Sequence, residues 1–334
     1  MSHDIGEMFY CGERPWHQLG NKLDQPATLE EALAAGGLDW TVSTVPIVPA
    51  DEPASTITHR VAVVRDDRLP GKAGRVVGVV HPGFRPLQNR EGAELFDSLL
   101  GQGKPIYHTG GYLRQGEVVW LMARVPYSIC LGGDDVLEPY LLFTNSHDGS
   151  VAIDIRLTTI RVVCQNTLSI ALASGKEGKV FRHPHNGSAA LLQAEAKDFF
   201  AFAIQQCKEA EELFKRLAEA KCTKPEFQSF LSKLMPDPRM PATATKNVSV
   251  RRAHETRLKK LHITRAEITD VHLNGIATQD IPPAEDTWWG ALNTLTGWVD
   301  HVQAIESDRY AHILLGSGDR FKSVTLRRIQ AEVK

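Results

Sequence analysis

Hydrophobic and polar residues alternate most regularly over residues 139–164. Tyr140-Leu141-Leu142-Phe143 is an apolar run typical of a strand, and Asn145–Ser150 has the composition of a tight turn. From Val151 to Leu157 the chain is rich in β-branched residues and alternates with a period of two. This pattern predicts a long β-hairpin over residues 139–164.

The alternation shifts by one residue after Thr158-Thr159. A shift of this kind predicts a β-bulge, in which one extra residue re-aims the side chains that follow. Asn166 comes next and can cap a short helix over Thr167–Ser174. The hairpin is therefore expected to run directly into a helix.

Strand-like runs and short helical segments alternate before the hairpin. Thr28 and Glu31 form a capping box, which predicts a helix over Leu29–Ala35, and Asn89 can cap a second helix. The expected strands cover residues 40–48, 56–64, 75–81, 106–113 and 117–125. The fold class predicted from this order is α+β, with a mostly antiparallel sheet and flanking helices.

The period becomes helical after Gly187. Residues 188–221 contain no glycine or proline and place Phe199, Ala203 and Leu213 on one stripe, which predicts a long amphipathic helix. Further helices are expected over 223–235, 249–261, from Thr287, and over 319–333. We therefore expect an α+β core over 1–186, the long helix plus a short one over 187–236, and a basic, helical region over 237–334.

The composition is that of a globular protein, with 42% hydrophobic and 23% charged residues. No apolar run approaches the length of a membrane span, and the first residues lack the pattern of a secretory signal. Five cysteines are scattered without Cys-x-x-Cys spacing. We expect a cytoplasmic protein with reduced thiols and no contact with a membrane.

The formal net charge of −2 gives no global field that would attract a polyanion. Nucleic-acid binding would therefore need a local basic surface, and the segment from residue 246 to residue 265 offers one, with Glu255 as its only acid. A helix with this composition suits phosphate binding, although it can equally pair with an acidic face of a neighbouring subunit. The candidate residues in this segment are Lys246, Arg251, Arg252, Arg257, Lys259 and Lys260.

The second strand of the hairpin offers another candidate phosphate-binding face. Arg156 and Arg161 lie on either side of Thr158 and Thr159. Guanidinium and hydroxyl groups together suit phosphate oxygens. In the alternative interpretation the arginines pair with carboxylates such as Asp154 or Glu138.

Catalytic chemistry has little support in the pattern. His147 and Asp148 belong to the hairpin turn, whereas Cys164 lies about sixteen residues further along an extended strand, so a Cys–His pair is not expected. We predict no catalytic residue and keep Asn145, His147 and Asp148 as a possible site at the hairpin tip.

Motifs for metals and cofactors are missing from the sequence. No His-Glu-x-x-His or Cys-x-x-Cys pattern occurs, and the glycine-rich stretches lack the Gly-Lys-Ser/Thr ending of a phosphate loop. We expect neither a metal nor a cofactor. The tryptophans at 16, 288, 289 and 298 can serve as base-stacking platforms or as anchors of a subunit interface.

The stretch FTNSHDGS followed by TTIRVVCQNTL resembles the signature of a family catalogued as domain of unknown function 932, and GERPWHQLG and residues 288–322 fit the same family. The resemblance implies an origin in phages or plasmids but no particular activity. The order of a hairpin, a helix and a long amphipathic helix also resembles phage annealing proteins of the Red-beta and RecT kind, which assemble into rings or filaments on DNA.

These observations predict a non-enzymatic protein that binds or anneals single-stranded DNA and forms homo-oligomers. The first alternative is a hydrolase of nucleic acid or nucleotides, centred on His147, Asp148 and Asp154. The second is an anti-defence protein that binds a host protein.

Overall fold

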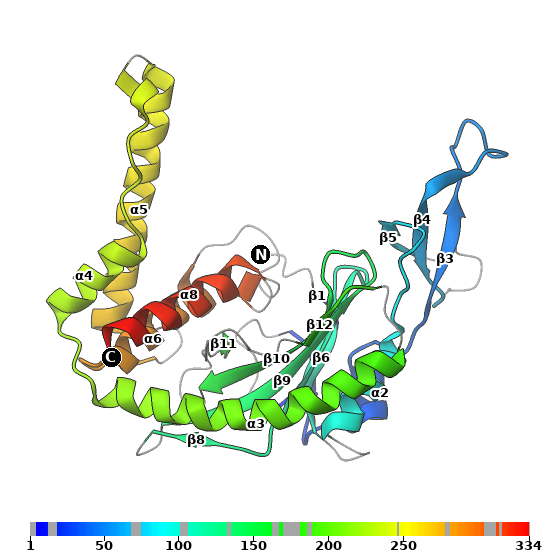
Figure 1. Ribbon diagram of the computed structural model, residues 1–334, viewed down its shortest axis with the longest axis horizontal. Helices are drawn as coiled ribbons and strands as arrows, with labels where there is room; N and C mark the ends of the chain where they lie inside the picture. Colours follow the sequence, from blue (N-terminus) through cyan, green and yellow to red (C-terminus); the bar gives the residue numbers. More distant parts are fainter. Residues whose placement is uncertain are drawn as a thin grey trace.

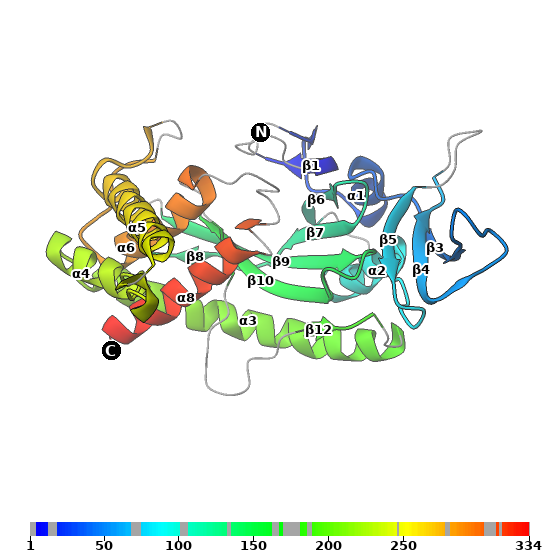
Figure 2. The same cartoon turned by 90° about the horizontal axis from the view of Figure 1, so that it is seen from above.

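The computed structural model describes residues 5–12, 19–67, 75–100, 106–131, 135–161, 167–169, 181–185, 189–245, 247–277, 281–303, 312–313 and 316–333. These residues form an elongated body with a large sheet, from which two projections rise on the same side (Figure 1). One projection is a long helix and the other is a small sheet, and the two stand at opposite ends of the body (Figures 1 and 2).

The large sheet has the strand order β11-β10-β9-β7-β6-β1-β2. All its pairs are antiparallel except β1 with β2, which confirms the predicted α+β fold with a mostly antiparallel sheet. Two shorter strands, β12 and β8, pair with β10 and β9. The strands are β1 (Ile5–Cys11), β2 (Asn21–Leu23), β6 (Tyr107–Leu113), β7 (Val118–Arg124), β8 (Ile129–Cys130), β9 (Val136–Ser146), β10 (Ile153–Arg161), β11 (Thr167–Ser169) and β12 (Phe181–His183).

The predicted hairpin is the pair β9–β10, which lies inside the large sheet between β7 and the edge strand β11. Its register runs without interruption from Asp154 opposite Thr144 to Arg161 opposite Leu137, so the predicted bulge is wrong. The polar residues that suggested a slip, Thr158 and Thr159, are buried in an ordinary pleat because both faces of this central strand are covered.

The helix predicted over Thr167–Ser174 is also wrong for the residues of this range that the structure describes. Residues 167–169 form the strand β11, which pairs with β10, and residues 170–174 lie outside the described chain. The backbone groups on the free side of β10 need partners, and pairing with β11 supplies them, which outweighs the local capping signal.

The small sheet has the order β3-β4-β5, with β3 (Val42–Ile47), β4 (Ile57–Arg65) and β5 (Val76–Val80). The tip of the β9–β10 hairpin packs against it, because a Cβ atom added at Gly78 would lie only 2.6 Å from the carbonyl oxygen of His147. Only glycine allows so close an approach of two backbones.

Three helices cover one side of the large sheet. They are α1 (Leu29–Ala35), α2 (Asn89–Leu100) and α3 (Ala189–Glu219). The predicted long helix is confirmed, and it runs along the body beneath the sheet (Figure 1). Phe199, Ala203 and Leu213 of its apolar stripe are buried in the hydrophobic core. The stripe therefore packs within one chain.

The remaining helices form the end of the body opposite the small sheet. They are α4 (Lys224–Leu234), a 3₁₀ turn (Ala242–Thr245), α5 (Val248–Asn274), α6 (Trp288–Gly297), a π-helical turn η3 (Trp298–Val302) and α8 (Ser317–Glu332). An ion pair of 2.7 Å between Lys322 and Asp300 joins α8 to η3, and both side chains are fully buried.

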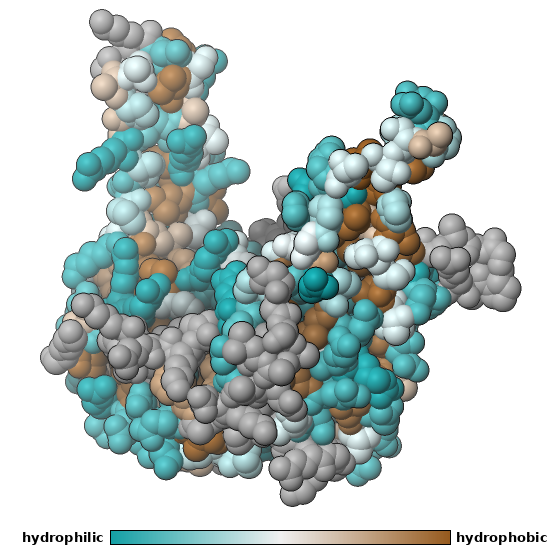
Figure 3. Space-filling view, turned by 45° about the vertical axis from the view of Figure 1, so that its right-hand side comes forward, coloured by the Kyte–Doolittle hydropathy of each residue, from teal (hydrophilic) through white to brown (hydrophobic). Residues whose placement is uncertain are grey.

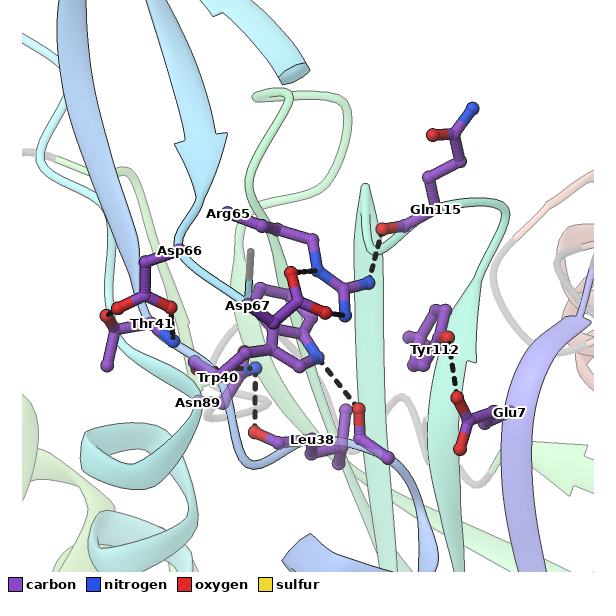
Figure 4. A network of polar contacts seen from close by, with 11 residues as sticks. Glu7, Leu38, Trp40, Thr41, Arg65, Asp66, Asp67, Asn89, Tyr112 and Gln115 are labelled. Atoms are coloured by element: carbon purple, nitrogen blue, oxygen red, sulfur yellow. Dashed lines mark hydrogen bonds and ion pairs between the residues drawn. The ribbon is translucent and has the colours of Figure 1, made fainter. Parts of the chain in front are cut away.

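Arg65 connects the small sheet to the large one (Figure 4). Its side chain is 3% exposed, and its guanidinium carbon lies 4.0 Å from the ring centroid of Trp40 and 5.0 Å from that of Tyr112. The same group pairs with Asp67 at 2.5 Å and donates to the carbonyl of Gln115 at 2.5 Å. Cation–π contacts and hydrogen bonds thus fix the end of β4 on the body.

Replacing Arg65 with methionine (Arg65→Met) is expected to lower the free energy of unfolding by about 2 kcal/mol, because the Gln115 carbonyl loses a buried donor and two cation–π contacts disappear. Urea denaturation measures this loss. Arg90→Met is the matched control, since the Arg90 ion pair with Glu30 is exposed and such pairs contribute at most about 1 kcal/mol. Equal losses in both variants would contradict the connecting role of Arg65.

Candidate nucleic-acid interface

The helix α5 forms the first projection and carries the basic segment. Asn247 caps its N-terminus, where the Asn247 side-chain oxygen accepts hydrogen bonds from the backbone N–H groups of Ser249 and Val250. The chain segment after α4 covers one side of the helix, where the His254 ring bonds to the carbonyl of Pro238 at 2.9 Å. The other sides of its outer part face solvent (Figure 3).

Five basic residues of α5 are exposed, and we call them the α5 basic surface. Within the described ranges, none of their side chains has an ion pair. The stretch of α5 from residue 251 to residue 260 that carries them contains one acidic residue, Glu255. Lys246, the sixth residue predicted for this surface, lies outside the described chain. The α5 basic surface consists of Arg251, Arg252, Arg257, Lys259 and Lys260.

The α5 basic surface is not a single straight stripe. At 3.6 residues per turn its members span roughly 240° of the helix circumference. Arg251, Arg252 and Lys259 share one side, whereas Lys260 and Arg257 lie progressively further around. The projection therefore presents positive charge in several directions.

The arginine face predicted on the hairpin has a different environment. Arg156 bonds to Asp154 at 2.6 Å and to Asp319 of α8 at 3.1 Å. Thr158 and Thr159 are buried, and of Arg161 only the backbone pairing with Leu137 is described. The geometry favours the alternative in which Arg156 pairs with carboxylates, and this pairing ties β10 to α8.

The hairpin tip is also a structural junction. His147 and Asn145 are fully buried. The His147 Nε2–H donates to the side-chain oxygen of Asn89 at 2.9 Å, while the Asn89 amide donates to the Leu38 carbonyl at 3.0 Å. Asn145 donates to the carbonyl of Leu87 at 3.0 Å. These bonds join the tip to α2 and to the base of the small sheet.

The three residues proposed for a hydrolase do not converge. His147 bonds to Asn89, Asp148 faces Arg114 at 3.8 Å, and Asp154 bonds to Arg156. In the part of the chain that the structure describes, no three His, Cys, Asp or Glu residues are placed to hold a metal ion. Cys164 and Asn166 lie outside that part.

Two further features were not evident from sequence. Trp288, Trp289 and Trp298 are all buried, so they do not form an exposed stacking platform. Conversely, Arg60 in β4 and Arg75 beside β5 are exposed, and the described residues provide no ion pair for them. They are distant in the sequence, so no charge run marked them, and the pairing of β4 with β5 places them on one projection.

The buried imidazole of His147 makes stability depend on pH. Burial, with smaller effects from His185 and Arg65, lowers the pKa of His147 to about 3. The unfolded chain therefore binds a proton near pH 6.5 that the folded chain does not bind, so stability is full above pH 6.5 and is lost as the pH falls. Between pH 7 and pH 5, protonation of this residue in the unfolded chain alone is expected to lower the free energy of unfolding by about 2 kcal/mol.

His147→Gln should reduce the fall in unfolding free energy between pH 7 and pH 5 by about that amount, as measured by urea denaturation at each pH. His59→Gln, at an exposed histidine of β4, is the control and should leave the pH dependence as it is. An unchanged pH dependence in His147→Gln would exclude a buried, neutral His147.

Comparison with known proteins identifies a family to which no activity is assigned. No curated protein and no solved structure matches the chain. Among the described residues no helix is long and apolar enough to cross a membrane. A family model described as a domain of unknown function matches residues 76–330, which include the hairpin, its tip and the α5 basic surface. The chain therefore belongs to the DUF932 family.

Proposed function

We propose that this protein binds single-stranded DNA through the α5 basic surface, without reading its sequence, and that it promotes annealing. The observation that carries the proposal is a set of five exposed cationic side chains, with no ion pair among the described residues, on a helix that projects from the body. The buried cations of the body differ from these five, since Arg156, Arg65 and Lys322 are each paired with a carboxylate.

Electrostatics supports a polyanionic ligand. Cations crowded on one helix repel each other, and a phosphate backbone relieves this repulsion while releasing its condensed counterions. The net charge of −2 shows that the excess on α5 is local and is balanced elsewhere on the chain. Binding should therefore weaken steeply as salt rises.

The distribution of the charges supports a flexible single strand. A rigid duplex meets one side of a helix, whereas a single strand can follow positive side chains that span roughly 240° of its circumference. Trp288, Trp289 and Trp298 are buried, so contacts to phosphates dominate. A strand held by its phosphates keeps its base edges free to pair with a complement, which is the requirement for annealing.

A protein partner is the second candidate. Ile263 is 49% exposed on α5 and, with Leu258 and Ala266, lines a shallow apolar groove beside Lys259. An acidic protein surface with an apolar anchor would fit this combination, as the anti-defence alternative requires. Absence of DNA binding at low salt would leave this candidate in place of the first.

The double variant Lys259→Ala with Lys260→Ala should weaken binding of a labelled single-stranded oligonucleotide and reduce the slope of log K against log salt by about 1.4, because each phosphate contact contributes about 0.7. Fluorescence anisotropy at several salt concentrations measures both quantities. The same titration with a duplex is expected to give weaker binding.

Lys208→Ala with Arg216→Ala is the matched control. Both residues are exposed on α3, carry the same total charge and have no ion pair in the described ranges. This control should keep the slope of the unaltered protein. If the two double variants lower the slope equally, binding follows total charge and does not depend on the α5 basic surface.

A further inference from the structure

The small sheet is attached to α2 by the segment between β5 and α2, residues 81–88, which we call the connecting segment. It lies against His185. The Arg85 N–H donates to the His185 carbonyl at 2.7 Å, and the ring centroids of Phe84 and His185 are 4.5 Å apart. The far end of the connecting segment reaches α2, whose first residue bonds to His147. Two buried histidines therefore flank this attachment.

Both imidazoles are held in the same tautomer. The Nε2 of His147 bonds to the side-chain oxygen of Asn89 at 2.9 Å, and the Nε2 of His185 bonds to the carbonyl of Val151 at 3.0 Å. These oxygens can only accept, so Nε2 carries the hydrogen in each ring. The other ring nitrogen, Nδ1, is buried in both residues, and among the described residues it has no hydrogen-bond partner. A proton added to either ring therefore creates a buried N–H without an acceptor, which is costly.

Charged groups near the two rings also affect their protonation. Burial dominates the environment of His147, and the nearby His185 and Arg65 further oppose a positive charge on its ring. Burial also lowers the pKa of His185, whereas its hydrogen bond to a carbonyl and the Asp148 carboxylate favour the charged ring. Asp148 lies 3.8 Å from Arg114, which offsets part of its charge. While the contact is closed, protonation of one ring thus makes protonation of the other harder.

We infer that this contact is an acid-sensitive switch: protonation of His147 and His185 releases the connecting segment, and with it β5, from the hairpin tip. In the released state both rings reach water and bind their protons, so a falling pH favours release. The bonds of Arg65 to Asp67 and to the Gln115 carbonyl involve no histidine, so β4 stays attached. The small sheet is then joined to the body through β4 and no longer through β5.

This release is a local opening, distinct from unfolding of the whole chain. Proteins open in cooperative units, and those with few buried apolar contacts open at the lowest cost in free energy. The connecting segment is such a unit, since Leu87 is the one buried residue among its eight. The switch does not rest on DNA binding.

Hydrogen exchange of the full chain, read by mass spectrometry at pH 7 and pH 5 and corrected for the intrinsic rate at each pH, tests the switch. A ring that stays unprotonated in the closed state and titrates near pH 6.5 in the open state raises the open population about 25-fold between these pH values. The protection of residues 76–88 should therefore fall at least about 25-fold. At pH 5, low concentrations of urea should hardly change the exchange of residues 76–88, whereas α3, which exchanges through a larger unfolding, should respond strongly.

The double variant His147→Gln with His185→Gln keeps an N–H donor at each position but cannot titrate, so the fall in protection should disappear. His185→Gln alone should remove part of it. His272→Gln is the matched control, because His272 is a buried histidine of α5, 3% exposed, that lies outside this contact, and it should leave the fall unchanged. Circular dichroism checks that each variant folds.

The switch is overturned if residues 76–88 are equally protected at pH 5 and pH 7, or if their exchange responds to urea as that of α3 does. It is also overturned if the double variant retains the full fall, or if His272→Gln abolishes the fall to the same degree. Should the double variant not fold, an unchanged fall in His185→Gln would contradict the switch. None of these measurements uses nucleic acid, so their outcome is independent of the proposed function.

Discussion

The hydrogen bond between His147 and Asn89 joins the tip of the β9–β10 hairpin to α2 where the small sheet meets the body. It connects the tip of the β9–β10 hairpin to the first turn of α2, and the imidazole that donates it is fully buried, which lowers its pKa and keeps it neutral. The side-chain amide of Asn89 in turn donates a hydrogen bond to the Leu38 carbonyl, and the backbone at His147 packs on Gly78 of the small sheet. The second projection therefore depends on a contact made at a turn of the first sheet.

The distribution of charged groups divides the molecule into two regimes. The buried cations of the body are paired: Arg65 with Asp67, Arg156 with Asp154 and Asp319, and Lys322 with Asp300. Burial makes such pairs necessary, because an uncompensated charge inside the protein is costly. The five cations of the α5 basic surface face water and have no ion pair in the described chain, so their charge is available to a ligand, whereas Arg265 of the same helix pairs with Asp237. This contrast is the physical basis of the proposed function.

Local patterns predicted the elements well and their surroundings less well. The capping box at Thr28 and Glu31 and the uninterrupted helical period over 188–221 correspond to α1 and α3, because both signals act within one or two turns. The predicted helix over 249–261 continues to Asn274, where Gly275 ends it. The alternative that paired Arg156 with Asp154 could be drawn from the sequence, but its second partner could not, since Asp319 lies 163 residues further along the chain. Likewise, a buried threonine in a central strand has the same local signature as a bulge.

Chemical footprinting of lysines with and without a single-stranded oligonucleotide tests the central claim most directly. Acetylation of Lys259 and Lys260, read by mass spectrometry, reports whether phosphates cover these amines, and Lys208 on α3 reports the background in the same sample. The account predicts that the oligonucleotide protects Lys259 and Lys260 at low salt, that high salt removes the protection, and that Lys208 reacts equally in all samples. Bound oligonucleotide with undiminished acetylation of Lys259 and Lys260 would contradict it.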